Sequence, residues 1–193
     1  MAVPPPTPDP AKTALRTDLR ARRAAHVDAL GEDGANAAAQ AAADHVLPHI
    51  PAGAIVSLYL ALQDELDPDA LIAALHARGH ELALPTLLDR TTMRFLAWQP
   101  GDPLERGPMK LRQPLPTSPE RAPDLIVTPL LGFDSLGGRI GYGAGHYDRA
   151  FQRYAGAHRI GFAWAMQQID KVPHDPWDVR LHAVVTEQGF LGL

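Results

Sequence analysis

The feature that most constrains the fold is a strand, a helix and a second strand that follow one another within about thirty residues. Residues 54–60 form a short apolar run rich in strand-forming side chains, which predicts a buried strand. A helix is predicted over residues 67–78, and a second strand over residues 81–84. Because strands joined by a helical crossover pair in parallel, this unit predicts a parallel sheet covered by helices.

The remaining elements extend this pattern. Two helices are expected before the first strand, over residues 12–30 and 34–46, and one over residues 146–154. Further strands are expected over residues 94–98, 124–128, 159–164 and 182–186. The fold class that follows is α/β, with a three-layer α/β/α arrangement and a mostly parallel, Rossmann-like sheet that carries helices on both faces.

Two proline-rich stretches lie outside this pattern. Residues 1–10 hold five prolines, which predicts a disordered tail ahead of a single domain over residues 11–193. Residues 100–123 hold seven prolines, and we interpret them as a long and mostly irregular loop. Loops of that length within one domain are often functional covers.

Composition excludes several classes of function. The net charge of −4 gives no basic footprint for nucleic acid, and the absence of cysteine rules out thiolate metal sites. No apolar run approaches the ~20 residues that a membrane span needs. The N-terminus lacks the basic and apolar stretches of a signal peptide, so a cytoplasmic location is expected. No repeat or coiled coil is visible, and a monomer is the default expectation.

The stretch Arg139–Asp148, RIGYGAGHYD, is the most informative part of the chain. Its three glycines, Gly141, Gly143 and Gly145, stand between a predicted strand and a predicted helix. Glycine lets backbone N–H groups approach a phosphate closely, and a helix start adds unpaired donors. The spacing is neither that of a Walker A loop nor that of a dinucleotide fingerprint. The stretch is therefore either a phosphate-binding loop or a flexible turn.

Acidic side chains at two places near the predicted sheet carry open interpretations. Asp148 falls in a first helical turn, where the helix dipole favours a negative charge, but it could also hold Mg²⁺. The cluster Gln63-Asp64-Glu65 follows the first predicted strand, and ligands of parallel sheets bind beyond the carboxyl ends of strands. A carboxylate there could accept paired hydrogen bonds from an amino-pyrimidinone such as a pterin, or the cluster could be an exposed acidic loop that precedes the next helix.

Basic side chains recur along the first predicted helix at Lys12, Arg16, Arg20 and Arg23. Their spacing of four, four and three places them on one face, and a solvated helix face is the usual reason for such a stripe. Nine histidines are scattered along the chain. The one pair at helical spacing, His45 and His49, has Pro48 between its members, so we do not predict a metal site there.

Together these stretches resemble the 5-formyltetrahydrofolate cyclo-ligase family from residue 12 to residue 186. The motifs that carry the resemblance stand in the family's order: Lys12-x-x-Leu15-Arg16, Tyr59-x-x-x-Gln63-Asp64-Glu65, Gly132-Phe133-Asp134, Arg139-x-Gly141-Tyr142-Gly143-x-Gly145-x-Tyr147-Asp148, Gly161-Phe162-Ala163, Gln167, Asp178-Val179 and Val184-Val185-Thr186-Glu187.

The resemblance implies an ATP-dependent enzyme that acts on a small-molecule folate, with Mg²⁺ as cofactor. ATP would phosphorylate the oxygen of the N5-formyl group of 5-formyltetrahydrofolate and turn it into a leaving group. N10 would then attack the formyl carbon, which gives 5,10-methenyltetrahydrofolate, ADP and phosphate. The protein's contribution would be positioning and charge stabilisation.

The resemblance also implies roles for individual residues. Catalytic roles fall on Lys12, Arg16 and Tyr147. The residues implied in ATP binding are Lys12, Arg16, Arg139, Ile140, Gly141, Tyr142, Gly143, Ala144, Gly145, His146 and Tyr147. Those implied in folate binding are Leu60, Glu65, Tyr142, Gly143, Ala144, Gly145 and His146. Asp148 is the implied Mg²⁺ ligand. The loop at residues 100–123, with Lys110 and Arg112, could close over the site or meet the glutamate tail of the folate.

Two positions depart from the family's pattern. His146 stands where the family has a tyrosine, and an imidazole keeps an aromatic ring that can form hydrogen bonds. His182 stands where the family has an aspartate associated with Mg²⁺, and imidazole is a poor ligand for that ion. His182 as a second metal position is therefore doubtful. A paralogue that uses ATP on another formyl or carboxyl compound, or a folate-binding protein without turnover, remains an alternative.

Overall fold

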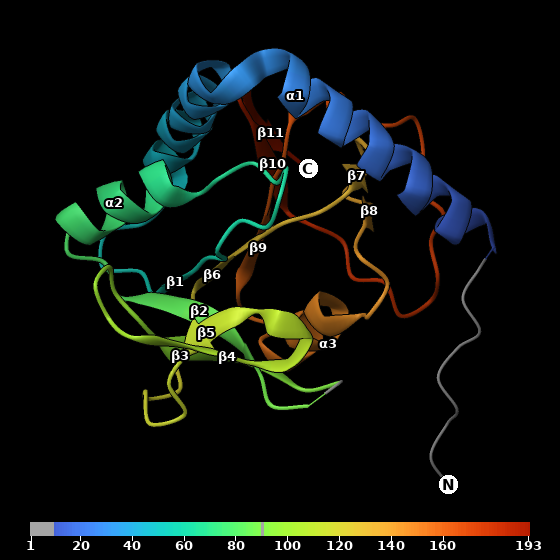
Figure 1. The fold of residues 1–193 in the computed structure, drawn as a ribbon. Coiled ribbons are helices and arrows are strands. Elements are labelled where there is room, and N and C mark those ends of the chain that lie inside the picture. The colour runs from blue at the N-terminus through green and yellow to red at the C-terminus, as the bar shows by residue number, and fades with distance from the viewer. Residues whose placement is uncertain (1–9, 90) are drawn as a thin grey trace, which may run out of the picture.

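A seven-stranded sheet forms the centre of the molecule in the computed structural model, which describes residues 10–89 and 91–193 (Figure 1). The strand order is β11-β10-β9-β6-β1-β2-β3. The five inner strands pair in parallel: β1 (Val56–Ser57), β2 (Leu82–Leu87), β6 (Leu125–Thr128), β9 (His158–Phe162) and β10 (Ala183–Thr186). The edge strands β3 (Met93–Ala97) and β11 (Gly189–Gly192) are antiparallel to their neighbours. The mostly parallel sheet is as predicted.

Helices cover both faces of this sheet, which confirms the three-layer arrangement. Figure 1 shows α1 (Pro10–Val46) and α2 (Asp69–Ala77) on one side and α3 (His146–Arg153) on the other. Successive residues of β6 alternate between two hydrophobic clusters: Leu125 and Val127 pack under α1 and α2, and Ile126 packs with α3. This alternation is the period-2 pattern of a strand that is buried on both faces.

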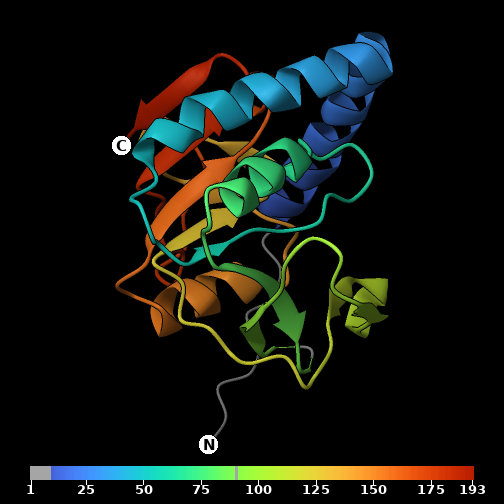
Figure 2. The same ribbon diagram turned by 90° about the vertical axis from the view of Figure 1, so that its left-hand side faces the viewer.

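The first helix, α1, consists of two helical segments, as the sequence predicts, although no loop separates them. It runs over 37 residues and is interrupted only at Gly31, whose φ of 66° and ψ of 176° are not helical. Glycine adopts this backbone conformation without the steric cost that a Cβ brings. The two halves meet at an angle (Figure 2). The N-terminal half runs past β7 (Gly132–Phe133) and β8 (Arg139–Ile140), and the C-terminal half packs on the core (Figure 1).

The proline-rich segment 100–123 is more ordered than expected. It contains an antiparallel hairpin of β4 (Leu104–Arg106) and β5 (Arg112–Pro114), with a 3₁₀ turn (Pro108–Lys110) between the strands. Gln113 is buried and fastens this hairpin to β2, because its Oε1 accepts the N–H of Leu87 at 3.1 Å. Residues 1–9, the main part of the predicted tail, lie outside the described residues.

Candidate active site

The glycine-rich stretch leads from β8 into α3 at the carboxyl end of the parallel strands. Gly143 and Gly145 have φ values of 103° and 66°, so both positions require glycine. Arg16 Nε donates to the carbonyl oxygen of Gly141 at 3.0 Å, which ties the stretch to α1. No side-chain hydrogen bond caps α3 at Gly145. The loop, which comprises Gly141–Gly145, thus ends at a helix start whose dipole favours an anion.

Arg139 and Asp148 flank this loop and form an ion pair. Nη2 of Arg139 lies 2.7 Å from Oδ1 of Asp148, and the arginine side chain is only 6% exposed. The same carboxylate oxygen accepts the N–H of Val179 at 3.2 Å. Within the described part of the chain, the buried Nε of Arg139 has no hydrogen-bond partner. An anion at the loop could supply one.

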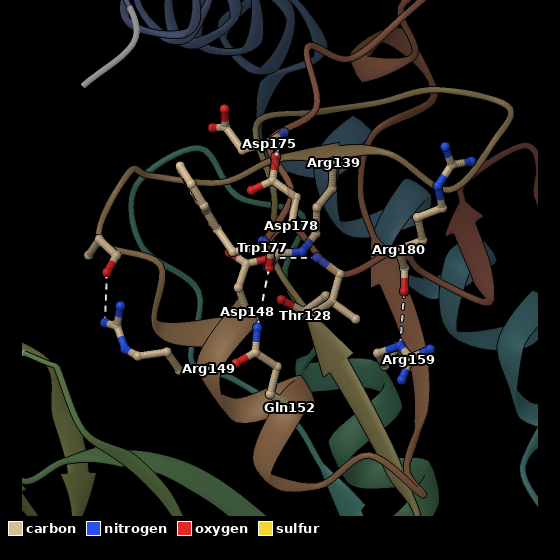
Figure 3. Close-up of polar contacts among 12 residues, drawn as sticks. Thr128, Arg139, Asp148, Arg149, Gln152, Arg159, Asp175, Trp177, Asp178 and Arg180 are labelled. Carbon is tan, nitrogen blue, oxygen red and sulfur yellow. Dashed lines mark hydrogen bonds and ion pairs between the residues drawn. The ribbon is translucent and has the colours of Figure 1, made fainter. Parts of the chain in front are cut away.

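Lys12 is held by two aspartates that sequence reasoning did not assign to the site. Its Nζ lies 2.7 Å from Asp175 and 2.5 Å from Asp178. Figure 3 shows both aspartates above Asp148, on the segment that leads to Val179. Burial lowers the pKa of Lys12, but hydrogen bonds and charge from the two aspartates outweigh it, so the pKa lies above 10.5. Lys12, Arg139 and their three aspartates therefore form one region of dense charge.

The folate side of the predicted site is centred on Glu65, which is buried after β1. Oε1 of Glu65 accepts the hydroxyl hydrogen of Tyr142, and Oε2 accepts the N–H of Leu62 at 2.9 Å. Burial raises the pKa of Glu65 above its usual value of 4.5, and these bonds oppose the rise. The structure thus joins Glu65 to the glycine loop through one phenol. Leu60 is half-buried and packs against the core.

Tyr147 lies at the start of α3, next to the carboxyl end of β6. Burial raises the pKa of its phenol, and a hydrogen bond with Thr128 opposes this rise. Its ring contacts Phe151 at a centroid distance of 5.9 Å. Ile140 is buried behind the loop, whereas Ala144 is exposed and its carbonyl oxygen accepts a bond from Arg149 at 2.7 Å. His146 is half-buried in the first turn of α3.

The structure does not bring His182 to Asp148. His182 immediately precedes β10, at the amino end of the parallel strands, where Nε2 lies 2.5 Å from Arg159 Nη2. Its ring stacks on His158 at a centroid distance of 4.7 Å. Across residues 10–89 and 91–193, no three His, Cys, Asp or Glu side chains are grouped as a metal site. Asp178 is a closer neighbour of Asp148, because Val179 links the two.

Comparison with known proteins identifies the group of enzymes to which these residues point. The sequence model of the 5-formyltetrahydrofolate cyclo-ligase family matches residues 8–187. The chain belongs to this family. The membership confirms the resemblance drawn from the motifs and, with it, the prediction of an enzyme.

Relatives and solved structures of cyclo-ligases agree with this assignment. A 5-formyltetrahydrofolate cyclo-ligase of Escherichia coli is 33% identical over 139 residues, which cover 68% of this chain and 76% of that protein. The enzyme of that name from Haemophilus influenzae is 30% identical over 181 residues, or 89% of this chain and 95% of its own. The NMR structure of Aquifex aeolicus 5,10-methenyltetrahydrofolate synthetase superposes with a TM-score of 0.80 at 25% identity, covering 94% and 92% of the two chains.

Among the residues that the structure describes, none of the helices combines the length and the apolar character needed to traverse a bilayer.

Proposed function

We propose that this chain catalyses the ATP-dependent cyclisation of 5-formyltetrahydrofolate to 5,10-methenyltetrahydrofolate. The observation that carries the proposal is the hydrogen bond between Tyr142 and Glu65. It joins a glycine loop suited to phosphate with a buried carboxylate suited to a pterin. A nucleotide on the loop and a folate at Glu65 would therefore lie next to each other.

The chemistry requires activation, because an amide-like formyl group is a poor electrophile and would have to expel hydroxide. The formyl oxygen attacks the γ-phosphorus of ATP, an O–P bond forms, and the bond to ADP breaks. N10 then attacks the formyl carbon and loses its proton. The C–O bond breaks as inorganic phosphate leaves, which gives the methenyl bridge. A phosphorylated formyl intermediate is thus part of the proposal.

Lys12, Arg16 and Arg139 supply the positive charge for this transfer. Arg16 and Arg139 lie against the loop, and Lys12 precedes Arg16 by one helical turn. The two aspartates that now hold Lys12 are the contacts that phosphate oxygens would replace. The N–H groups of Gly141–Gly145 cradle the phosphates, since positive φ values at Gly143 and Gly145 turn the backbone. Tyr147 and His146, at the start of α3, lie where the reacting group would meet the loop.

Mg²⁺ fits the carboxylates at this site. Asp148 and Asp178 offer the oxygen ligands that this ion prefers, and each is now paired with a cation. Metal binding at Asp148 would also release Arg139 toward phosphate. Bound with ATP, Mg²⁺ would neutralise phosphate charge. His182 is left out of this proposal because its contacts are with Arg159 and His158.

Three expectations from the sequence remain proposals beside this one. The exposed Arg112 on the β4–β5 hairpin is a candidate contact for the glutamate tail. If Arg112→Ala binds folate as tightly as the unaltered protein does, Arg112 does not contact the glutamate tail. A cytoplasmic location and a monomeric state are also proposed, and fractionation and light scattering would test them.

Absorbance of the methenyl product, measured after adding 5-formyltetrahydrofolate, ATP and Mg²⁺, tests the proposed function. We expect an ATP-dependent rise that Lys12→Ala and Asp148→Asn abolish. Lys171→Ala is the matched control, because Lys171 is an exposed lysine. If the formyl oxygen carries ¹⁸O, the label should appear in inorganic phosphate. Tight folate binding without ATP consumption would favour a regulatory protein, and ATP binding without folate binding would favour a paralogue.

A further inference from the structure

Arg23 does not behave as part of a solvated basic stripe. The residue is 2% exposed, whereas the side chain of its neighbour Arg22 is 47% exposed. Burying a guanidinium is costly unless it is paired and hydrogen-bonded, so this arginine needs a specific set of partners. The usual interpretation of such a stripe therefore fails at this position.

The partners of Arg23 come from three separate segments. Its Nε and Nη2 bond both carboxylate oxygens of Asp64 at 3.0 and 3.2 Å. Its Nη1 donates to the hydroxyl oxygen of Tyr142 at 2.9 Å and to the carbonyl oxygen of Leu130 at 3.4 Å. One side chain thus holds together the segment after β1, the segment after β6 and the glycine loop.

The direction of these hydrogen bonds constrains the state of Glu65. Arginine can only donate, so the Tyr142 hydroxyl accepts from Arg23 and must direct its own hydrogen to Glu65. The N–H of Leu62 donates to the other carboxylate oxygen. Both oxygens of Glu65 therefore act as acceptors, which is the arrangement of an ionised carboxylate. Only that form can receive two N–H groups from an amino-pyrimidinone.

We propose that Arg23 is a positioning residue for the folate half of the site. It holds Tyr142 and Asp64 around Glu65, and so keeps an ionised, correctly oriented carboxylate ready for the amino-pyrimidinone edge of the substrate. This inference rests on the proposed function for the identity of the substrate. Arg23 itself touches neither Glu65 nor the reacting atoms.

The electrostatic surroundings agree with this role. Burial raises the pKa of Glu65, the charge of Arg23 lowers it, and the charge of Asp64 raises it. Arg23 and Asp64 thus act on Glu65 in opposite directions. The titratable and charged groups that act with Glu65 come from four segments: Arg23 from α1, Tyr59 and Asp64 from the segment after β1, Tyr142 from the glycine loop, and Tyr147 from α3.

The main chain of the glycine loop does not depend on Arg23. Arg16 holds the carbonyl of Gly141 independently, and Gly143 packs against the Arg16 guanidinium. Loss of Arg23 should therefore disturb Tyr142 and Glu65 while it leaves the phosphate cradle in place. A selective effect on folate follows, with little effect on ATP.

The experiment compares Arg23→Met, Arg23→Lys and Asp64→Asn with Arg22→Met as the matched control. KM for each substrate and folate binding by equilibrium dialysis without ATP are measured from pH 5 to pH 8. For Arg23→Met we expect folate KM at pH 7 to rise about tenfold, as for loss of one charge-assisted hydrogen bond, and ATP KM to change less than about twofold. Arg22→Met should match the unaltered protein.

The pH dependence separates positioning from general damage to the fold. Folate binding fails as Glu65 becomes protonated, so the pH of half-binding should move up in Arg23→Met and down in Asp64→Asn. Arg23→Lys keeps the positive charge but loses the planar guanidinium group that makes the paired hydrogen bonds. Its pH of half-binding should therefore stay unchanged, while its folate KM rises. Three results would overturn the inference. The pH of half-binding could move in the same direction in Arg23→Met and Asp64→Asn, the KM values for folate and ATP could rise equally in Arg23→Met, or Arg22→Met could show the same effects as Arg23→Met.

The two proposals can fail separately. Unaltered protein that binds 5-formyltetrahydrofolate without turnover would sink the proposed function, and dialysis would still test Arg23. Active protein whose Arg23 variants leave folate binding unchanged would sink the inference alone. If Arg23→Met does not fold, two results still decide the question: an unchanged pH of half-binding with a raised folate KM in Arg23→Lys, and a lowered pH of half-binding in Asp64→Asn. Unaltered protein that binds no folate overturns both.

Discussion

Nζ of Lys12 lies 2.5 Å from Oδ2 of Asp178, although 166 residues separate them in the chain. Asp175 lies 2.7 Å from the same nitrogen. The first turn of α1 is thereby fastened to the segment before β10. The ammonium group of Lys12, which the proposed function assigns to the phosphates of ATP, is thus already held in place by ion pairs with these two carboxylates.

Replacement of Lys12 by methionine should affect both activity and stability. We expect cyclisation to fall at least about a hundredfold, because a charge directed at the phosphates is lost. Unfolding in urea should show a loss of about 1–2 kcal/mol, discounted for partial exposure of the aspartates, which would face each other without a cation. Lys171→Met serves as the control. Full activity in Lys12→Met would remove Lys12 from the site.

Alanine at Gly143 should weaken the phosphate cradle. The φ of 103° is strained for any residue with a Cβ, and that atom would lie 3.4 Å from the Arg16 guanidinium carbon. ATP KM should rise about tenfold and stability should fall by roughly 1 kcal/mol. Gly156→Ala is the matched control, because a Cβ there meets nothing within 4 Å. Equal kinetics of the two variants would argue against a phosphate role for the loop.

Glu65→Gln should change the KM for folate but not the KM for ATP. The amide keeps the shape of the side chain, but its nitrogen cannot accept hydrogen bonds from a pterin edge. We expect folate KM to rise about 10- to 100-fold, in line with the loss of charged hydrogen bonds, with ATP KM unchanged. Steady-state kinetics with each substrate varied in turn would show this. An unaltered folate KM would move the pterin away from Glu65.

Stability should fall in mild acid because of His182. Burial lowers its pKa below 6.5, and the charges of Arg159 and His158 lower it further. The unfolded chain therefore binds a proton that the folded chain resists, and stability is lost as the pH falls below about 6.5. Urea unfolding between pH 7.5 and pH 5 should show a smaller loss for His182→Gln. Parallel curves for the two proteins would contradict this account.

His182→Asp should leave the dependence of activity on Mg²⁺, which the proposed function expects, unchanged. The side chain contacts Arg159 and His158 at the amino end of the strands, whereas Asp148 lies at the start of α3. Titration of activity with Mg²⁺ should give the same midpoint for the variant and the unaltered protein. A lower midpoint would place His182 within reach of the metal.

The parallel sheet could be predicted because runs such as Leu125–Thr128 are apolar on both faces and alternate with helical segments. The edge strand β11 could not, since Gly189–Gly192 has two glycines and little apolar pattern. The β4–β5 hairpin escaped prediction for a different reason. The buried contact that fastens it to β2 joins Gln113 to Leu87, 26 residues earlier in the chain, and such a contact leaves no periodic trace in the sequence.

The glycine loop of the site was predictable, because three alternating glycines between a strand and a helix stand out in the sequence itself. Partners of the cations were not. Asp175 and Asp178 lie more than 160 residues from Lys12, and Arg23 differs from Arg22 only in the face of α1 that it occupies. A spacing of basic residues predicts a shared face, but it does not say which members of that face become buried.

The position of Lys12 depends on the angle between the two halves of α1, which meet at Gly31. Lys12 lies 19 residues before this non-helical residue, or about 28 Å along the N-terminal half of α1 at 1.5 Å per residue. A change of about 10° in the angle between the two halves would therefore carry Lys12 through about 5 Å, more than the reach of its ion pairs. The backbone angles of this one glycine thus determine where Lys12 lies relative to the glycine loop.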